Sequence, residues 1–92
     1  MYDSHKALYA RALKEYLSGA GETALKHAYE VGRNAVQNGL GIMDMASIHK
    51  NELLSVLSRA STAEECVETV KAEQKLFTEC LAPFELTHRG FK

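Results

Sequence analysis

The sequence has little that would interrupt a helix and no run that is long enough to cross a membrane. One proline and six glycines occur in 92 residues, and the glycines fall mostly around positions 19–21 and 39–41. Apolar runs are only a few residues long, whereas a membrane-spanning helix or a secretory signal needs a much longer one. We therefore expect a helical domain that stays in the cytoplasm and does not bind membranes.

Neither sign of charge dominates the chain. Eleven basic residues stand against twelve acidic ones, which gives a net charge of −1. Without a basic patch, the chain lacks the electrostatic surface with which proteins bind nucleic acid or anionic lipid. Nucleic acid and membrane surfaces therefore become minor candidates as partners.

The two cysteines, Cys66 and Cys80, are poorly placed for a disulfide. On one helix, their spacing corresponds to about 21 Å of rise, which is too far for a bond within one chain. We expect both to act as small apolar residues in a reducing compartment.

The length favours one domain that covers residues 1–92. Area scaling predicts that folding removes only about 64% of the surface of the unfolded chain. An oligomeric interface would increase the fraction of the surface that is buried.

Apolar residues recur at helical spacing in four segments, about 4–17, 22–38, 42–57 and 62–81. The last segment opens with Thr62 and Glu65 at the spacing of a capping box. Pro83 is expected to end this helix near Leu81 or to begin a continuation as far as Phe91. The pattern predicts an all-α bundle of four helices with a short C-terminal helical extension.

Gly32 stands in the middle of the second expected helix. A glycine there costs about 1 kcal/mol relative to alanine. Close approach of another helix would offset this cost, so we expect such an approach at Gly32.

The fourth segment carries a wide apolar stripe. Its residues alternate in steps of four and three, and they are Ala63, Val67, Val70, Gln74, Phe77, Leu81 and Phe84. Such a width exceeds what one bundle neighbour covers, which predicts contacts both inside the protomer and across a homodimer. The candidate core and dimer residues are Val67, Val70, Phe77, Leu81 and Phe84.

No arrangement of residues points to catalysis, a cofactor or a metal. The four histidines include no pair at the i,i+4 spacing of a helical zinc site, and Glu85 with His88 is a single E-x-x-H motif where a di-iron bundle needs two. His49 lies on an apolar stripe, so we expect a core or interface histidine that bonds to backbone or a carboxylate. A histidine phosphotransfer module is the alternative, and it requires an exposed His27 or His49.

Tyr2, Tyr9 and Tyr16 are spaced by sevens and would line one helical face. Such a stripe more often packs in the core, with the hydroxyl groups at its edge. The alternative is a sensor that binds a small apolar ligand in a pocket lined by tyrosines and methionines.

Several motifs, in order along the chain, resemble one family. They are YL at 16–17, GETAL at 21–25, AYEVGR at 28–33, GLGIMD at 39–44, IH at 48–49 and LAPFELTHRGF at 81–91. The family is the N-terminal domain of the phosphatase RsbU, and the similarity covers about Ala7 to Phe91. A similar helical dimer forms the C-terminal part of the clock protein KaiA, although the sequences do not match.

This resemblance implies a non-catalytic, homodimeric domain of bacterial stress-response signalling. It would receive a switch kinase such as RsbT and relay that event to a C-terminal output domain. The implied partner surface includes the start of the second helix and part of the last helix. Glu22 matches an acidic residue of the family there, and the candidate binding residues are Glu22, Lys26 and Glu30. Lys26 departs from the aromatic residue of RsbU, so the implied partner is RsbT-like rather than RsbT itself. A plain solvated face is the alternative reading of these three residues.

Overall fold

The computed structural model describes residues 2–90 and the side chains of residues 4–86, and the described backbone forms four helices without a strand. The helices are α1 (Tyr2–Leu17), α2 (Gly21–Gln37), α3 (Ile42–Leu57) and α4 (Ala63–Gly90). Gly19 and Gly39 take positive φ values of 103° and 81° in the turns that follow α1 and α2, a conformation that suits glycine because it lacks a Cβ atom. The predicted all-α class with four helices is confirmed.

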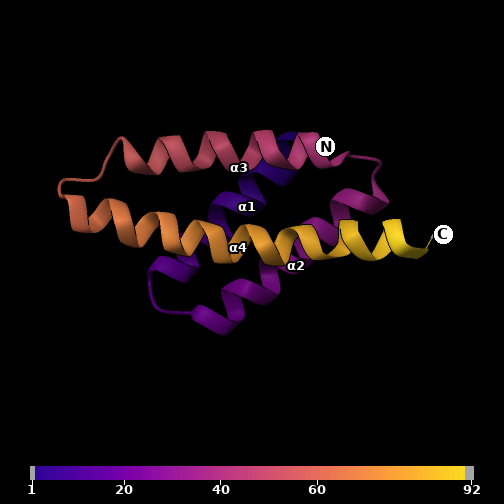
Figure 1. Ribbon diagram of the computed structural model, residues 1–92, viewed down its shortest axis with the longest axis horizontal. Coiled ribbons are helices and arrows are strands. Elements are labelled where there is room, and N and C mark those ends of the chain that lie inside the picture. The colour runs from indigo at the N-terminus through magenta and orange to yellow at the C-terminus, as the bar shows by residue number, and fades with distance from the viewer. Residues whose placement is uncertain (1, 91–92) are drawn as a thin grey trace.

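Two antiparallel helix pairs cross each other. Figure 1 shows α3 and α4 side by side along the longest dimension, while α1 and α2 pass obliquely behind them. The extents of 45 × 23 × 20 Å reflect the length of α4. One face of the α3 and α4 pair therefore lies against α1 and α2, and no other helix within residues 2–90 covers the opposite face.

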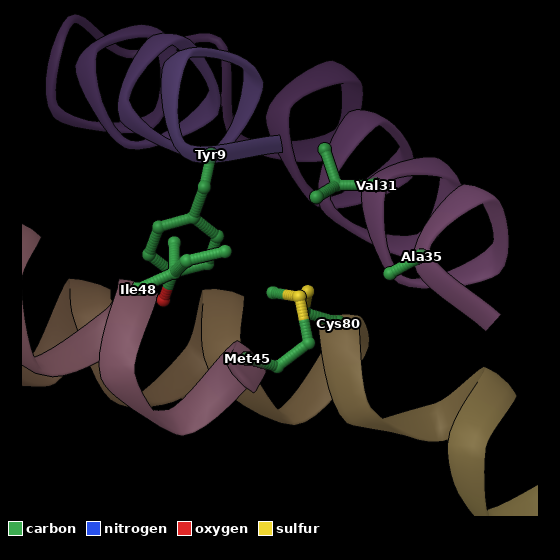
Figure 2. Close-up of a cluster of buried hydrophobic side chains, with 6 residues drawn as sticks. All are labelled: Tyr9, Val31, Ala35, Met45, Ile48 and Cys80. Atoms are coloured by element: carbon green, nitrogen blue, oxygen red, sulfur yellow. The ribbon is translucent and has the colours of Figure 1, made fainter. Parts of the chain in front are cut away.

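The core consists of two clusters of buried side chains. All four helices contribute to the first, which Figure 2 shows and which contains Tyr9, Val31, Ala35, Met45, Ile48 and Cys80. The second contains Ala12, Leu13, Ala24, Ala28, Ala72 and Leu76. Because α2 contributes mainly alanine to these clusters, its backbone can lie close to α4.

Gly32 marks the closest part of this contact. A Cβ atom placed on Gly32 would overlap the backbone carbonyl of Cys80 on α4. Only glycine leaves enough room for that carbonyl. The close helix approach predicted at Gly32 is confirmed.

Helix α4 runs through Pro83 without a break, so the expected end near Leu81 is wrong. Proline removes one backbone hydrogen bond from a helix interior. Here Pro83 is buried, Cys80 before it belongs to the first core cluster, and Phe84 after it packs against the same cluster. Burial on both sides offsets the lost bond, and the expected C-terminal extension is a continuation of α4 as far as Gly90.

Local side-chain bonds fix the starts of α3 and α4. The carboxylate of Asp44 accepts a hydrogen bond from the backbone N–H of Gly41 at 2.9 Å. At α4, the Thr62 hydroxyl oxygen accepts from the N–H of Glu65 at 3.0 Å, as the capping box predicts. The Glu65 carboxylate bonds the N–H of Ser61 at 2.6 Å, one residue earlier than the predicted Thr62.

Candidate functional site

Three polar side chains from three helices meet inside the bundle. The hydroxyl of Tyr9 on α1 donates a hydrogen bond to Oε1 of Glu73 on α4 at 2.8 Å. Nδ1 of His49 on α3 lies 2.8 Å from the same oxygen and 3.1 Å from the tyrosine hydroxyl. We call these three residues the buried polar cluster. The prediction that His49 bonds to a carboxylate is confirmed.

Burial controls the electrostatics of this cluster. The Glu73 side chain is only 1% exposed, and burial raises the pKa of its carboxyl group to about 7, while the bond from Tyr9 opposes part of that rise. Burial also raises the pKa of Tyr9 and lowers the pKa of His49. In each case burial disfavours the charged form of the side chain, which shifts its pKa toward the neutral form. The second carboxyl oxygen of Glu73, Oε2, is buried without a hydrogen-bond partner.

His49 connects the cluster to the outer part of α4. Its ring stacks on that of Phe77, with ring centroids 4.0 Å apart and planes at 9°. The imidazole is therefore held by Glu73 through Nδ1 and by Phe77 through its face. This contact forms part of the seam between α3 and α4.

The apolar stripe predicted on α4 is only partly used by the protomer itself. Val67 and Val70 are 51% and 43% exposed, while Phe77, Leu81 and Phe84 are half-buried. The buried face of α4 lies beside this stripe and consists of Thr69, Ala72, Glu73, Leu76, Cys80 and Pro83. We use the name outer stripe for Val67, Val70, Phe77, Leu81 and Phe84.

A surface groove continues the outer stripe toward the start of α3. Its volume is about 660 Å³, and its lining consists of Ile42, Thr78, Leu81, Ala82, Phe84 and Glu85. Exposed apolar side chains also occur at Met43 and Leu86. Exposed apolar side chains from both α3 and α4 therefore line or flank this groove.

The candidate partner residues follow successive turns of α2. Glu22 and Lys26 are exposed, and Glu30 is half-buried. Oε1 of Glu30 lies 3.6 Å from Nη1 of Arg33, at the distance of a surface ion pair. The structure places these residues on α2, which lies in the other helix pair from the outer stripe.

Glu30 also borders a groove between α1 and α2. The polar wall of this groove includes Arg11, Glu15 and His27. His27 is half exposed, and its Nδ1 lies 2.7 Å from Oε1 of Glu15. The phosphotransfer alternative requires an exposed His27 or His49. His27 is half exposed and lies against Glu15, whereas His49 is mostly covered at 22% exposure.

The described residues also bear on metal binding, on the cysteines and on a ligand pocket. Within residues 4–86, no group of three histidine, cysteine or acidic side chains could hold a metal ion, and the side chain of His88 lies outside that range. Cys66 and Cys80 are free thiols, and burial raises the pKa of Cys80 to about 12. Tyr9 and Met45, which a sensor pocket is expected to use, are packed in the core instead, and the side chain of Tyr2 lies outside residues 4–86. Among the described residues, no helix combines the length and apolar character of a membrane-spanning segment.

Comparison with known families finds a match over most of the chain. The sequence profile of the N-terminal domain of the phosphoserine phosphatase RsbU matches residues 7–87. The chain belongs to this family. No curated protein and no solved structure matches it. This match confirms the resemblance expected from the sequence motifs. The RsbU N-terminal domain is the regulatory part of such phosphatases and is distinct from their catalytic domain.

Sequence reasoning about this member of the family missed Tyr9 and Glu73 as polar partners of His49. The sequence does contain a signal for Glu73. It falls at helical spacing with Thr69, Leu76 and Cys80, which are all buried. An acidic residue at that position has to find a partner from another helix.

Proposed function

We propose that this chain is a non-catalytic, homodimeric receiving domain of a cytoplasmic bacterial signalling protein in the stress response. It binds a switch kinase of the RsbT type and relays that event to a C-terminal output domain. Membership of the RsbU N-terminal family supports the regulatory role. The apolar outer stripe on α4, which the protomer leaves partly uncovered, carries the proposal of a homodimer.

The surface area supports a second copy as the occupant of this face. The chain exposes 5957 Å², whereas scaling for a monomer of this mass predicts about 5,300 Å². The larger exposed area is in the direction expected for a protomer that buries part of its surface against a second copy. A twofold interface presents the same patch from both protomers, so one self-complementary apolar stripe is sufficient.

The proposed kinase surface lies on α2, around Glu22, Lys26 and Glu30. Because α2 belongs to the other helix pair, the kinase and the second protomer would occupy different surfaces and bind at the same time. Side chains of both signs on this face suit a partner with complementary charges, which mainly affects the rate and specificity of association.

Replacing both Val67 and Val70 with lysine is expected to convert the dimer into a folded monomer. Both side chains are already half exposed in the single protomer, so charges there leave its fold intact but would be buried across the dimer. Size-exclusion chromatography with light scattering at micromolar concentration measures the change, and circular dichroism checks that the helices remain.

Leu8→Lys is the matched control for this dimer test. Leu8 is 41% exposed, close to the exposure of Val70, but it lies on α1 in the other helix pair. We expect this variant to remain a dimer. A wild-type protein that elutes as a monomer, or a double-lysine variant that remains a dimer, would contradict the proposed interface.

Charge reversal on α2 tests the kinase surface separately. Glu22→Lys together with Lys26→Glu is expected to weaken binding of the purified RsbT-type kinase from the same genome by about tenfold or more, because an interface charge of the wrong sign repels its partner. Isothermal titration measures the affinity, and light scattering should show an unchanged dimer. Equal affinity in both proteins would refute this surface, and the exposed Lys75→Glu on α4 serves as the control.

A further inference from the structure

The buried polar cluster brings an acid, Glu73, and a base, His49, together at a depth where a net charge is energetically costly. His49 and Glu73 approach to 2.8 Å, and the glutamate is 1% exposed. Tyr9 adds a donor to the same oxygen, Oε1, while Oε2 has no partner. A charged carboxylate with one bare buried oxygen is costly unless a cation lies beside it.

The surroundings supply few other charges that could change this balance. On α3, Glu52 acts on both Tyr9 and Glu73, and its negative charge disfavours a second anion. On α1, His5 is buried one turn before Tyr9. On α4, the Cys80 thiol stays neutral near pH 7, since burial raises its pKa to about 12. The buried positions of α2 are Ala24, Ala28, Val31, Gly32 and Ala35, none of which titrates.

We infer that His49 and Glu73 share one proton in the folded domain and that this pair makes the packing of α1, α3 and α4 sensitive to pH. With one proton the pair is neutral overall, whether the proton resides on the imidazole or on the carboxyl group. A second proton leaves a net positive charge inside the bundle, and loss of the only proton leaves a net negative one. Either change weakens the seam where His49 stacks on Phe77.

The direction of the pH effect follows from the proton count in each state. Between the ordinary pKa values of 4.5 and 6.5, the unfolded chain carries an ionised Glu73 and a protonated His49, which is also one proton. The pair then contributes no slope to stability. Below 4.5 the unfolded pair takes up a second proton, whereas a folded pair that shares one proton resists the net positive charge that a second proton would place inside the bundle. Stability is therefore lost as the pH falls.

Above 6.5 the sign is reversed. The unfolded pair loses its last proton, while the folded pair keeps it until the pH passes the raised Glu73 pKa of about 7. The folded state then binds more protons than the unfolded state, so stability falls as the pH rises through this interval. The fall corresponds to roughly a threefold drop in the ratio of folded to unfolded protein.

Urea unfolding of the whole chain at pH 5.5 and 7.5, at one fixed protein concentration, tests the inference. The wild type should be less stable at pH 7.5 than at pH 5.5, and His27→Gln, which removes the exposed His27 and Glu15 pair but keeps the buried polar cluster, should show the same sign. Glu73→Gln should show the opposite sign, because a lone buried His49 with a lowered pKa gains stability as the unfolded histidine loses its proton. The same sign in the wild type and in Glu73→Gln would overturn the inference.

Nuclear magnetic resonance on the wild type gives a result that does not depend on a variant's ability to fold. The carboxyl carbon of Glu73 and the ring nitrogens of His49 are followed from pH 4 to pH 8. Coupled titration, with no change in the total proton count of the pair between pH 4.5 and 6.5, supports the inference. Two independent titrations near the ordinary values of 4.5 and 6.5 would refute it. Neither measurement uses a kinase, and the magnetic resonance titration follows Glu73 and His49 directly, so failure here is separate from failure of the proposed function.

Discussion

Gly32→Ala is expected to lower the free energy of unfolding by about 2 kcal/mol or more. In most helices the same change raises stability by about 1 kcal/mol, because glycine is the weaker helix former. Here the new methyl group would overlap the backbone carbonyl of Cys80. Backbone cannot rotate away as a side chain can, so α2 and α4 must separate along their contact. Urea unfolding followed by circular dichroism measures the loss.

Gly21→Ala provides a control with the same chemical change in the same helix. The nearest atom to its new methyl group is Cε1 of Tyr16 at 3.8 Å, an ordinary contact distance. We expect this variant to be as stable as the wild type or slightly more so. If Gly32→Ala matched Gly21→Ala in stability, α2 and α4 would not make the contact described above.

Leu76→Ala is expected to cost about 2 to 5 kcal/mol, because it removes a fully buried side chain and leaves a cavity. Leu76 is 0% exposed and lies in the second core cluster with Leu13 and Ala28. The measurement is again urea unfolding, at a concentration low enough to keep the protein monomeric. The urea concentration at the unfolding midpoint should fall, while the m-value, the dependence of the unfolding free energy on urea concentration, stays constant.

Val70→Ala tests whether the buried face of α4 is assigned correctly. Val70 is 43% exposed in the protomer, and alanine is the better helix former, so the stability of the monomer should change little. Comparable losses for Leu76→Ala and Val70→Ala would mean that the outer stripe packs inside the protomer.

Local sequence signals located the helices well. The third helix spans 42–57 both as predicted and as observed, and the starts of α2 and α4 differ by one residue from the predicted ones. Such accuracy has a physical basis. Gly39, Asp44 and Thr62 act through the backbone of their own turns, so no other part of the chain is needed to interpret them.

Apart from the close approach at Gly32, the sequence did not predict how the helices pack against one another. Periodicity identified a wide apolar surface on the fourth helix but did not determine which half of it the chain itself covers. Leu76 and Cys80 face α2, whereas Val67 and Val70 do not reach the core. That choice depends on the crossing of the two helix pairs, which no local pattern in α4 encodes.

The buried polar cluster was predictable only in part. An apolar environment around His49 indicated a bond to backbone or a carboxylate, but the identity of Glu73 depends on how α3 lies against α4. Pro83 illustrates the opposite error. Its local preference predicts a break, and the burial of Cys80 and Phe84 on either side overrides that preference.

The contact between Gly32 and the Cys80 carbonyl has a mechanical consequence. Helix α4 continues from Cys80 to Gly90, which corresponds to about 15 Å of rise. If α4 tilts on α2 at this contact by about 5°, the backbone at Gly90 moves by roughly 1.3 Å, so the helix acts as a lever. A larger residue at position 32 would push α4 away from α2 at this contact, and the C-terminal end of α4 near Gly90 would move with it.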